Sequence, residues 1–148
     1  MRISSKGRYG LAAMISLAQN YASDECTTIV SISEKLGISK IYLEQVFALL
    51  KRSELVIAVK GAQGGYKLAK HPKTMNAYEI LRALEQSLFE KTEESVAKQA
   101  NDIEQAMQKT VFSVVDESVS AALKKITLDD LVNEVEKQKQ TDGFMFYI

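Results

Sequence analysis

The chain has 148 residues, of which 46% are hydrophobic and 26% are charged, as expected for one soluble globular domain with an appended element. Its 19 Lys and Arg residues balance 19 Asp and Glu residues, but residues 1–80 carry an excess of five positive charges and residues 81–148 an excess of five negative ones. The single cysteine (Cys26) and the single histidine (His71) exclude a disulfide framework and multi-cysteine or multi-histidine metal motifs. Because the sequence shows no set of catalytic residues, we expect no enzymatic activity.

The N-terminal segment, residues 7–21, predicts an amphipathic helix. Its apolar side chains recur near helical spacing, at Leu11, Met14, Ile15, Ala18 and Tyr21. A basic start followed by an apolar run is also typical of a secretory signal peptide, which is the alternative interpretation. Because the longest uncharged run is too short and too polar to span a membrane, we expect a cytoplasmic protein.

A short helix, a glycine turn and a longer helix follow in the order of a helix-turn-helix motif. Ser31 and Glu34 form a capping-box pattern at the start of the short helix, and Gly37 is suited to end it. Ser39 can cap the longer helix, residues 40–52, whose apolar positions are Leu43, Val46, Phe47 and Leu50. In such motifs the second helix enters the major groove of DNA.

The next segment predicts a β-hairpin. A β-branched run over residues 55–60 and an alternating run over residues 66–70 flank a glycine-rich turn at residues 61–65. A hairpin behind a helix-turn-helix motif makes a winged helix. The glycines would let the tip of this wing approach another surface closely, such as a DNA backbone.

The C-terminal half predicts three helices. Residues 76–79 open a capped helix that we expect to include Leu88, and Thr127 is expected to cap a short final helix. Residues 95–125 contain neither Pro nor Gly and repeat apolar residues at 3–4 spacing, which predicts a long helix with a narrow apolar seam. This helix either packs on its own domain or, as we favour, pairs with a second copy of the chain. The expected dimerisation residues are Ile103, Met107, Val111, Val114 and Ala121.

The predicted fold is therefore mainly α with a small β-hairpin wing, a winged helix-turn-helix domain followed by a long C-terminal dimerisation helix. We expect a DNA-binding domain over residues 1–75 and a connecting helix and hinge over residues 76–94. Dimerisation helices over residues 95–140 and a tail over residues 141–148 complete the chain.

Four segments resemble one bacterial family. They are Met1–Tyr9, Gly37–Gln45, Val59–Tyr66 and Ile126–Leu131, and they lie in order over most of the chain. On these segments the sequence is similar to the Rrf-two (Rrf2) family of winged-helix transcription regulators, which includes IscR-like and CymR-like proteins. The resemblance implies a homodimeric repressor whose N-terminal domains bind a pseudo-palindromic operator in double-stranded DNA.

The chain departs from the cluster-binding members of this family. Those members carry three closely spaced cysteines before and at the start of the dimer helix, whereas residues 87–108 here contain neither cysteine nor histidine. We therefore expect no iron–sulfur cluster and no other metal or cofactor.

The last residues, Asp142–Ile148, resemble the tail of the cluster-free CymR-like repressors of cysteine metabolism. That branch is associated with cysteine synthase as a partner. The resemblance implies that the tail residues Phe146, Tyr147 and Ile148 bind this enzyme and that Ile148 provides the captured C-terminal carboxylate. The other interpretation is that the tail packs onto the dimer helices.

The expected DNA-binding residues lie in the basic half of the chain. Basic side chains would neutralise phosphates, and the helix start at Ser39 would offer backbone N–H groups. Glu44 matches the family position that reads a base, since a carboxylate can accept from cytosine N4. Lys60 stands where the family usually has arginine, which keeps the charge but loses the planar fork. The full set is Arg2, Ser4, Lys6, Tyr9, Ser39, Lys40, Tyr42, Glu44, Gln45, Lys51, Lys60, Gln63 and Tyr66.

Two further alternatives stay open. Cys26 is either a loop thiol without a role or a redox switch whose oxidation reshapes the loop before the helix-turn-helix motif, although Asp24 and Glu25 beside it disfavour the thiolate. The alternative to a DNA-binding regulator is a protein-interaction module that binds an enzyme through its C-terminal tail, with no sequence-specific DNA binding.

Overall fold

Nine helices and strands follow one another in the computed structural model, which describes the backbone of residues 2–146 and the side chains of residues 2–143. They are α1 (Ser5–Gln19), α2 (Ile29–Leu36), α3 (Lys40–Arg52), β1 (Val56–Val59), β2 (Gly65–Leu68), α4 (Ala77–Leu84), α5 (Asn101–Met107), α6 (Ser113–Lys124) and α7 (Leu128–Phe146). Short turns of other helix types are η1 (Tyr21–Ser23), η2 (Pro72–Thr74), η3 (Gln86–Phe89) and the π-helical η4 (Gln108–Phe112).

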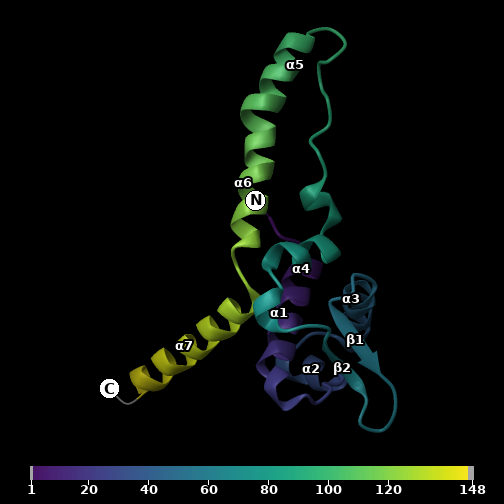
Figure 1. Cartoon of the computed structure of the whole chain (residues 1–148), viewed down its shortest axis with the longest axis vertical. Helices are drawn as coiled ribbons and strands as arrows, with labels where there is room; N and C mark the ends of the chain where they lie inside the picture. The colour runs from purple at the N-terminus through teal and green to yellow at the C-terminus, as the bar shows by residue number, and fades with distance from the viewer. Residues whose placement is uncertain (1, 147–148) are drawn as a thin grey trace.

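The chain divides into a head, a rod and a side arm (Figure 1). The elements α1 to α4 with β1 and β2 gather into what we call the head domain. Helices α5 and α6, joined by η4, rise from it as one rod, and α7 projects to the side. The mainly α fold with a winged helix-turn-helix domain and a long C-terminal helix is confirmed. No helix in the described part of the chain is both long and apolar enough to cross a membrane.

Polar side chains set where the helices of the helix-turn-helix motif begin. The predicted cap Ser39 accepts the Tyr42 N–H at the start of α3, and the predicted stop Gly37 is left-handed, with φ 68°. The capping box predicted at Ser31 is wrong. Thr28 Oγ1 accepts the Ser31 N–H instead, so α2 already begins at Ile29.

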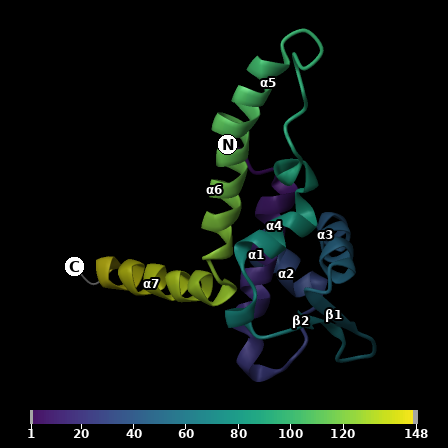
Figure 2. The ribbon, with the colours of Figure 1, turned by 45° about the horizontal axis from the view of Figure 1, so that its top comes forward.

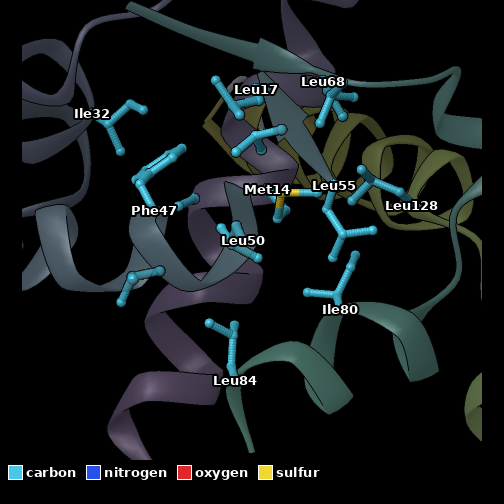
Figure 3. Close-up of a cluster of buried hydrophobic side chains, with 14 of the residues drawn as sticks. Met14, Leu17, Ile32, Phe47, Leu50, Leu55, Leu68, Ile80, Leu84 and Leu128 are labelled. Carbon is cyan, nitrogen blue, oxygen red and sulfur yellow. The ribbon is translucent and has the colours of Figure 1, made fainter. Parts of the chain in front are cut away.

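The hydrophobic core of the head domain lies between α1, α3 and α4 (Figure 3). Met14 from α1, Phe47 from α3 and Ile80 from α4 are all fully buried. All four apolar positions predicted for α3 are buried, which confirms the helical spacing assigned to this segment: Leu43, Val46, Phe47 and Leu50. Each large apolar side chain buried in this way contributes about 1.5–3 kcal/mol.

The start of α7 belongs to the same core. Leu128 is fully buried and lies in the cluster with Leu55 and Leu68 (Figure 3). The Leu128 N–H donates to the Met75 carbonyl at 2.9 Å, and the Ala77 N–H donates to the Ile126 carbonyl at 2.8 Å. The chain therefore returns to the head domain after the rod, a contact that the prediction of dimerisation helices over residues 95–140 did not anticipate.

Helices α4 and α7 both begin with a capping box. The side chains of Asn76 and Glu79 each accept the other residue's backbone N–H, and Thr127 and Asp130 do the same. The predicted caps Asn76 and Thr127 are confirmed. The predicted length of the last helix is wrong, because α7 is 19 residues long and ends at Phe146.

The long helix of the C-terminal half begins later than predicted. Residues 95–99 form bends and turns, and the helical rod starts at Asn101. Leu88 was expected inside the preceding helix but lies in η3, after α4 has ended at Leu84. The segment after η3 runs beside α5 and α6 to the start of the rod, as both views show (Figures 1 and 2).

A buried carboxylate explains why the rod starts late. Glu104 Oε2 accepts the backbone N–H groups of Ser95 at 3.0 Å and Val96 at 2.8 Å, and Oε1 accepts Gln108 Nε2 at 3.2 Å. The bonds from Val96, Ser95 and Gln108, in that order, lower the pKa of Glu104, against the desolvation that raises it. These bonds hold residues 95 and 96 in a loop folded against α5, so they cannot extend the helix.

The lower end of the rod is held on α4 by an aromatic cluster. Lys124 Nζ lies 4.6 Å from the centroid of the Tyr78 ring, and Phe89 packs edge-on against the same ring with centroids 5.0 Å apart. Tyr78 therefore contacts both the end of α6 and the segment that leads to the rod.

We expect Glu104→Gln to loosen the loop over residues 95 and 96, because glutamine lacks the charge that strengthens both N–H bonds. Amide hydrogen exchange at Ser95 and Val96 should become faster, whereas Glu94→Gln, an exposed change in the same loop, should leave it unaltered.

The same bonds predict a pH dependence. Since folding lowers the pKa of Glu104, its stabilisation is complete above the unfolded-state pKa and is lost as the pH falls through the folded-state pKa. The difference in thermal stability between wild type and Glu104→Gln should shrink over that acidic range. Equal exchange rates and equal stability at neutral pH would contradict this account.

Candidate nucleic-acid interface

The predicted recognition helix, α3, presents a polar face to solvent. Four of the predicted DNA-binding residues on this helix are exposed, on the side away from the buried apolar positions: Lys40, Glu44, Gln45 and Lys51. Ser39 is exposed at the helix start, where unpaired N–H groups of the first turn can bind a phosphate. The head domain thus displays hydrogen-bonding side chains along one helix.

Ile41, an apolar residue that is not in the predicted DNA-binding set, lies on the same helix. Ile41 is 72% exposed. A side chain in that position could contact the methyl group of thymine in a major groove. The signal was present in the sequence, because Ile41 lies outside the spacing of the four buried positions.

Two tyrosines bring α1 and α3 together. The rings of Tyr9 and Tyr42 meet edge to face, with centroids 5.3 Å apart and planes at 83°. Such a pair contributes about 0.5–1.5 kcal/mol beyond area burial. Tyr9 is 38% exposed and Tyr42 is half-buried, so both rings combine packing with an accessible edge. Two predicted DNA-binding residues, one from α1 and one from α3, are therefore neighbours.

The N-terminal segment is anchored by Glu85, a residue after α4 that the sequence analysis did not identify. Ser4 Oγ accepts the Gly7 N–H at 3.3 Å and caps α1, while the Ser4 N–H donates to the carboxylate of Glu85 after α4. Arg2 is exposed and Lys6 is half-buried in a shallow groove that Arg52 and Glu85 also line. No pattern in a single sequence links Ser4 to a residue so far along the chain.

The wing is attached to the loop that precedes α2. Strands β1 and β2 pair antiparallel, from Val56 opposite Leu68 to Val59 opposite Gly65. Thr27 and Tyr66 exchange two backbone hydrogen bonds of 2.8 Å, so the loop pairs with β2 on the side away from β1.

The Tyr66 side chain fixes the wing to α3. Its half-buried ring packs on Phe47 with centroids 4.6 Å apart. Lys60 and Gln63 are exposed at the tip, whereas Lys67 forms an exposed ion pair of 3.2 Å with Asp24. Two of the predicted wing residues are thus accessible, and Tyr66 is mainly a packing residue.

Two of the wing glycines serve contacts inside the chain, which corrects their predicted purpose. A Cβ on Gly65 would lie 2.6 Å from the Thr27 carbonyl oxygen, and one on Gly64 would lie 2.9 Å from the Gly61 carbonyl oxygen. Gly65 also has φ 144°, which disfavours other residues. Of the three wing glycines, only Gly61 has open space where a side chain would be. Gly61 is therefore the wing glycine at which an outside surface could come close to the backbone.

Cys26 lies half-buried in the loop between η1 and α2. The next residue, Thr27, holds the wing, and Thr28 caps α2. A redox role for Cys26 stays a prediction. Its position indicates that oxidation would act first on the wing attachment and on the start of the helix-turn-helix motif.

The predicted dimerisation residues form an exposed apolar row on the rod. Ile103 is 56% exposed, Val111 50% and Val114 51%, Ala121 is exposed and Met107 is half-buried. The prediction missed Val115, which is 52% exposed and follows Val111 by one helical turn. The row therefore does not pack on the head domain of its own chain.

The predicted partner-binding tail lies at the edge of the described part of the chain. The side chain of Phe146, and Tyr147 and Ile148 as a whole, lie outside the described residues. Within residues 2–143, no three or more His, Cys, Asp or Glu side chains gather in a way that could hold a metal ion. Glu104, the buried carboxylate of the rod, accepts hydrogen bonds from three N–H donors of the protein.

Comparison with known proteins gives consistent matches. Residues 3–134 match the sequence model of the Rrf2 family, described as "Iron-dependent Transcriptional regulator". The chain is 34% identical to the HTH-type transcriptional regulator CymR of Bacillus subtilis (strain 168) over 148 residues, which covers 100% of both chains.

Solved structures of the same group are also similar. B. subtilis CymR, described as "the Global Cysteine Regulator" of that organism, has a TM-score of 0.75 with 31% identity and covers 90% of this chain and 98% of its own. T. potens IscR has a TM-score of 0.75 with 37% identity, over 99% of this chain and 97% of its own. The oxidized form of Staphylococcus aureus CymR has a TM-score of 0.69 with 34% identity, over 89% and 96%.

Proposed function

The chain belongs to the Rrf2 family of transcriptional regulators, and on this premise we propose that it is a homodimeric repressor that binds a pseudo-palindromic operator in double-stranded DNA. One observation carries this proposal. The exposed polar face of α3 lies on the same head domain as α1 and the wing, because Tyr9 of α1 packs on Tyr42 of α3 and Tyr66 of β2 packs on Phe47 of α3. The role is regulatory, with no catalytic step.

Affinity and specificity come from different residues of this surface. Lys40, Lys51 and Lys60 are exposed cations that can neutralise phosphates without reading sequence. The exposed carboxylate of Glu44 can accept from cytosine N4, and Ile41 can contact a thymine methyl group. We therefore assign sequence specificity mainly to Glu44 and its neighbours on α3.

The charge distribution supports the same orientation. The excess of five positive charges belongs to residues 1–80, which make up most of the head domain, and the excess of five negative charges belongs to residues 81–148, which include the rod and α7. A polyanion repels the acidic part and attracts the basic one. Each protomer would thus approach DNA with its head domain.

Dimerisation would cover the exposed row on the rod. Exposed valine and isoleucine side chains at helical spacing are the usual seam of a helix–helix contact. Pairing two copies through Ile103, Val111 and Val114 would remove these side chains from water and hold two head domains at a fixed separation. Such a separation is what a pseudo-palindromic operator requires.

The proposed effector does not involve an iron–sulfur cluster. The family description mentions iron, but residues 87–108 of this chain contain no cysteine or histidine. The carboxylate of Glu104 in this stretch already accepts three hydrogen bonds from the protein. The residues present therefore do not fit a cluster, and we propose a regulator without a cofactor.

The regulated process that we propose is cysteine metabolism in the cytoplasm. This proposal is supported by the full-length similarity to B. subtilis CymR, which is described as a global cysteine regulator. We also propose that cysteine synthase captures the C-terminal carboxylate of Ile148. The described part of α7 projects away from the head domain (Figure 2).

Glu44→Ala and Lys60→Ala should separate base reading from phosphate binding. Glu44→Ala should reduce the preference for operator over random DNA by about tenfold, because one base contact contributes ~1–3 kcal/mol of discrimination. Lys60→Ala should weaken both complexes equally and make the log–log salt slope shallower by about one unit per contact. Titrations at several salt concentrations measure both effects. If Glu44→Ala weakens both complexes equally, Glu44 does not read sequence.

The double substitution Val111→Asp with Val114→Asp should convert the dimer into a monomer, since two charges per protomer would enter an apolar contact. Sedimentation analysis measures the oligomeric state. Val30→Asp, at a valine that is 48% exposed on the head domain, is the matched control and should leave the dimer intact. A dimer that persists in the double variant would place the contact elsewhere.

Deletion of Tyr147 and Ile148 should abolish binding of purified cysteine synthase while the dimer and its DNA binding persist. A pull-down with the full-length and shortened chains tests this expectation. Retained binding of the enzyme would remove the tail from the proposed contact, and a loss of dimer stability would assign the tail to packing.

A further inference from the structure

Glu85 is a buried carboxylate at the end of α4. It is 6% exposed, and its Oε1 accepts the backbone N–H of Ser4, 81 residues earlier in the chain. None of the ion pairs among the described residues involves it. Burying a carboxylate is costly unless hydrogen bonds replace its water, so the Ser4 amide is the group that keeps this side chain in place.

Helix α1 leaves space for this carboxylate at Gly7. A Cβ on Gly7 would lie 2.8 Å from Glu85 Cγ and 2.9 Å from Cδ, closer than real Cβ atoms come. Gly7 has no positive φ, so its backbone does not need glycine. A glycine inside a helix is less favourable than alanine, and the space taken by Glu85 accounts for its presence here.

Glu85 also lies at the point where the chain leaves the head domain. Its N–H donates to the Leu81 carbonyl and ends α4, and its carbonyl accepts the Leu88 N–H in η3. The preceding Leu84 is buried between α4 and α1 (Figure 3). After η3 the chain runs along the rod to the start of α5 (Figure 2). One residue thus connects the N-terminal segment, the end of α4 and the path to the dimer contact.

We propose that Glu85 is a positioning residue that holds residues 2–6 for phosphate contact and makes their position depend on the linker to the dimer helix. Arg2 and Lys6 flank the Ser4 amide that Glu85 binds. With that amide fixed, both cations keep a defined place beside α1. This inference rests on the proposed DNA-binding function and adds to it a route by which the dimer contact affects the phosphate contacts.

The coupling follows from the geometry. A shift of η3 moves the backbone of Glu85, because residues 85 and 88 share a hydrogen bond. The carboxylate then moves relative to α1, against which it packs at Gly7. The Ser4 amide either follows it or loses its acceptor, and in both cases Arg2 and Lys6 change position. A signal that reaches the linker is thereby converted into a change of DNA affinity.

The test uses the full-length dimer and random-sequence duplex DNA, so the operator need not be known. Glu85→Ala should weaken binding about tenfold and make the log–log salt slope shallower by about one unit per protomer, because a phosphate contact is lost. Gly7→Ala should do the same, since its methyl group displaces the carboxylate. Glu85→Gln should recover most of the wild-type slope, because its amide oxygen can still accept the Ser4 N–H.

A double-mutant cycle makes the test specific. Gly7→Ala combined with Glu85→Ala should bind DNA no more weakly than Glu85→Ala alone, because the carboxylate that the methyl group displaces is already gone. Glu90→Gln removes the same negative charge from the exposed part of the linker and should change the slope little. Additive losses in the double variant would overturn the proposed contact.

The possible failures are distinguishable. If the wild-type dimer shows no salt-dependent binding to duplex DNA, the proposed function fails and the inference fails with it. If the wild type binds and Glu85→Ala and Gly7→Ala form folded dimers with unchanged slope, Glu85 only stabilises the head domain and the inference alone is overturned. Gly7→Ala preserves helix formation, and Glu85→Gln preserves the volume of the side chain. The test can therefore be decided even if Glu85→Ala does not fold.

Discussion

The close packing of α4 on α1 is the constraint on which the rest of the structure depends. Leu84 and Glu85 lie against α1 where Gly10 and Gly7 leave space for them. This contact sets where the N-terminal segment begins, where α4 ends and in which direction the chain leaves for the rod. The recognition helix is fixed on the same support, because Tyr9 of α1 packs on Tyr42 of α3.

The rod depends on this support through two further contacts. The Tyr78 ring on α4 meets both Phe89 before the rod and Lys124 at its end, and Leu128 returns to the core directly after it. The segment that leads into the rod and the end of α6 are therefore both held on the head domain, while the apolar row of the rod remains exposed. A second copy of the chain that covers this row would be positioned relative to the DNA-binding surface, which is what a dimeric regulator of this family needs.

Local signals in the sequence predicted several helix ends that local interactions determine, although the cap at Ser31 was wrong because Thr28 caps α2 instead. Ser39, Gly37 and Asn76 act within one helical turn, so their roles as caps and stop could be read from the sequence. Leu128 and Glu85 could not be predicted, because their contacts join segments far apart in the chain. The exposed polar side of α3 followed from helical periodicity, whereas the anchoring of the N-terminal segment to Glu85 is a tertiary contact that periodicity does not encode.

The central claim is that two head domains bind one operator together. Hydroxyl-radical footprinting of the full-length protein on the DNA upstream of its own gene tests it most directly. Two symmetric protected regions are expected on one face of the duplex, with centres about one helical turn, ~34–36 Å, or a multiple of it apart. A single protected region, or protection that does not differ from that on random DNA, would contradict it.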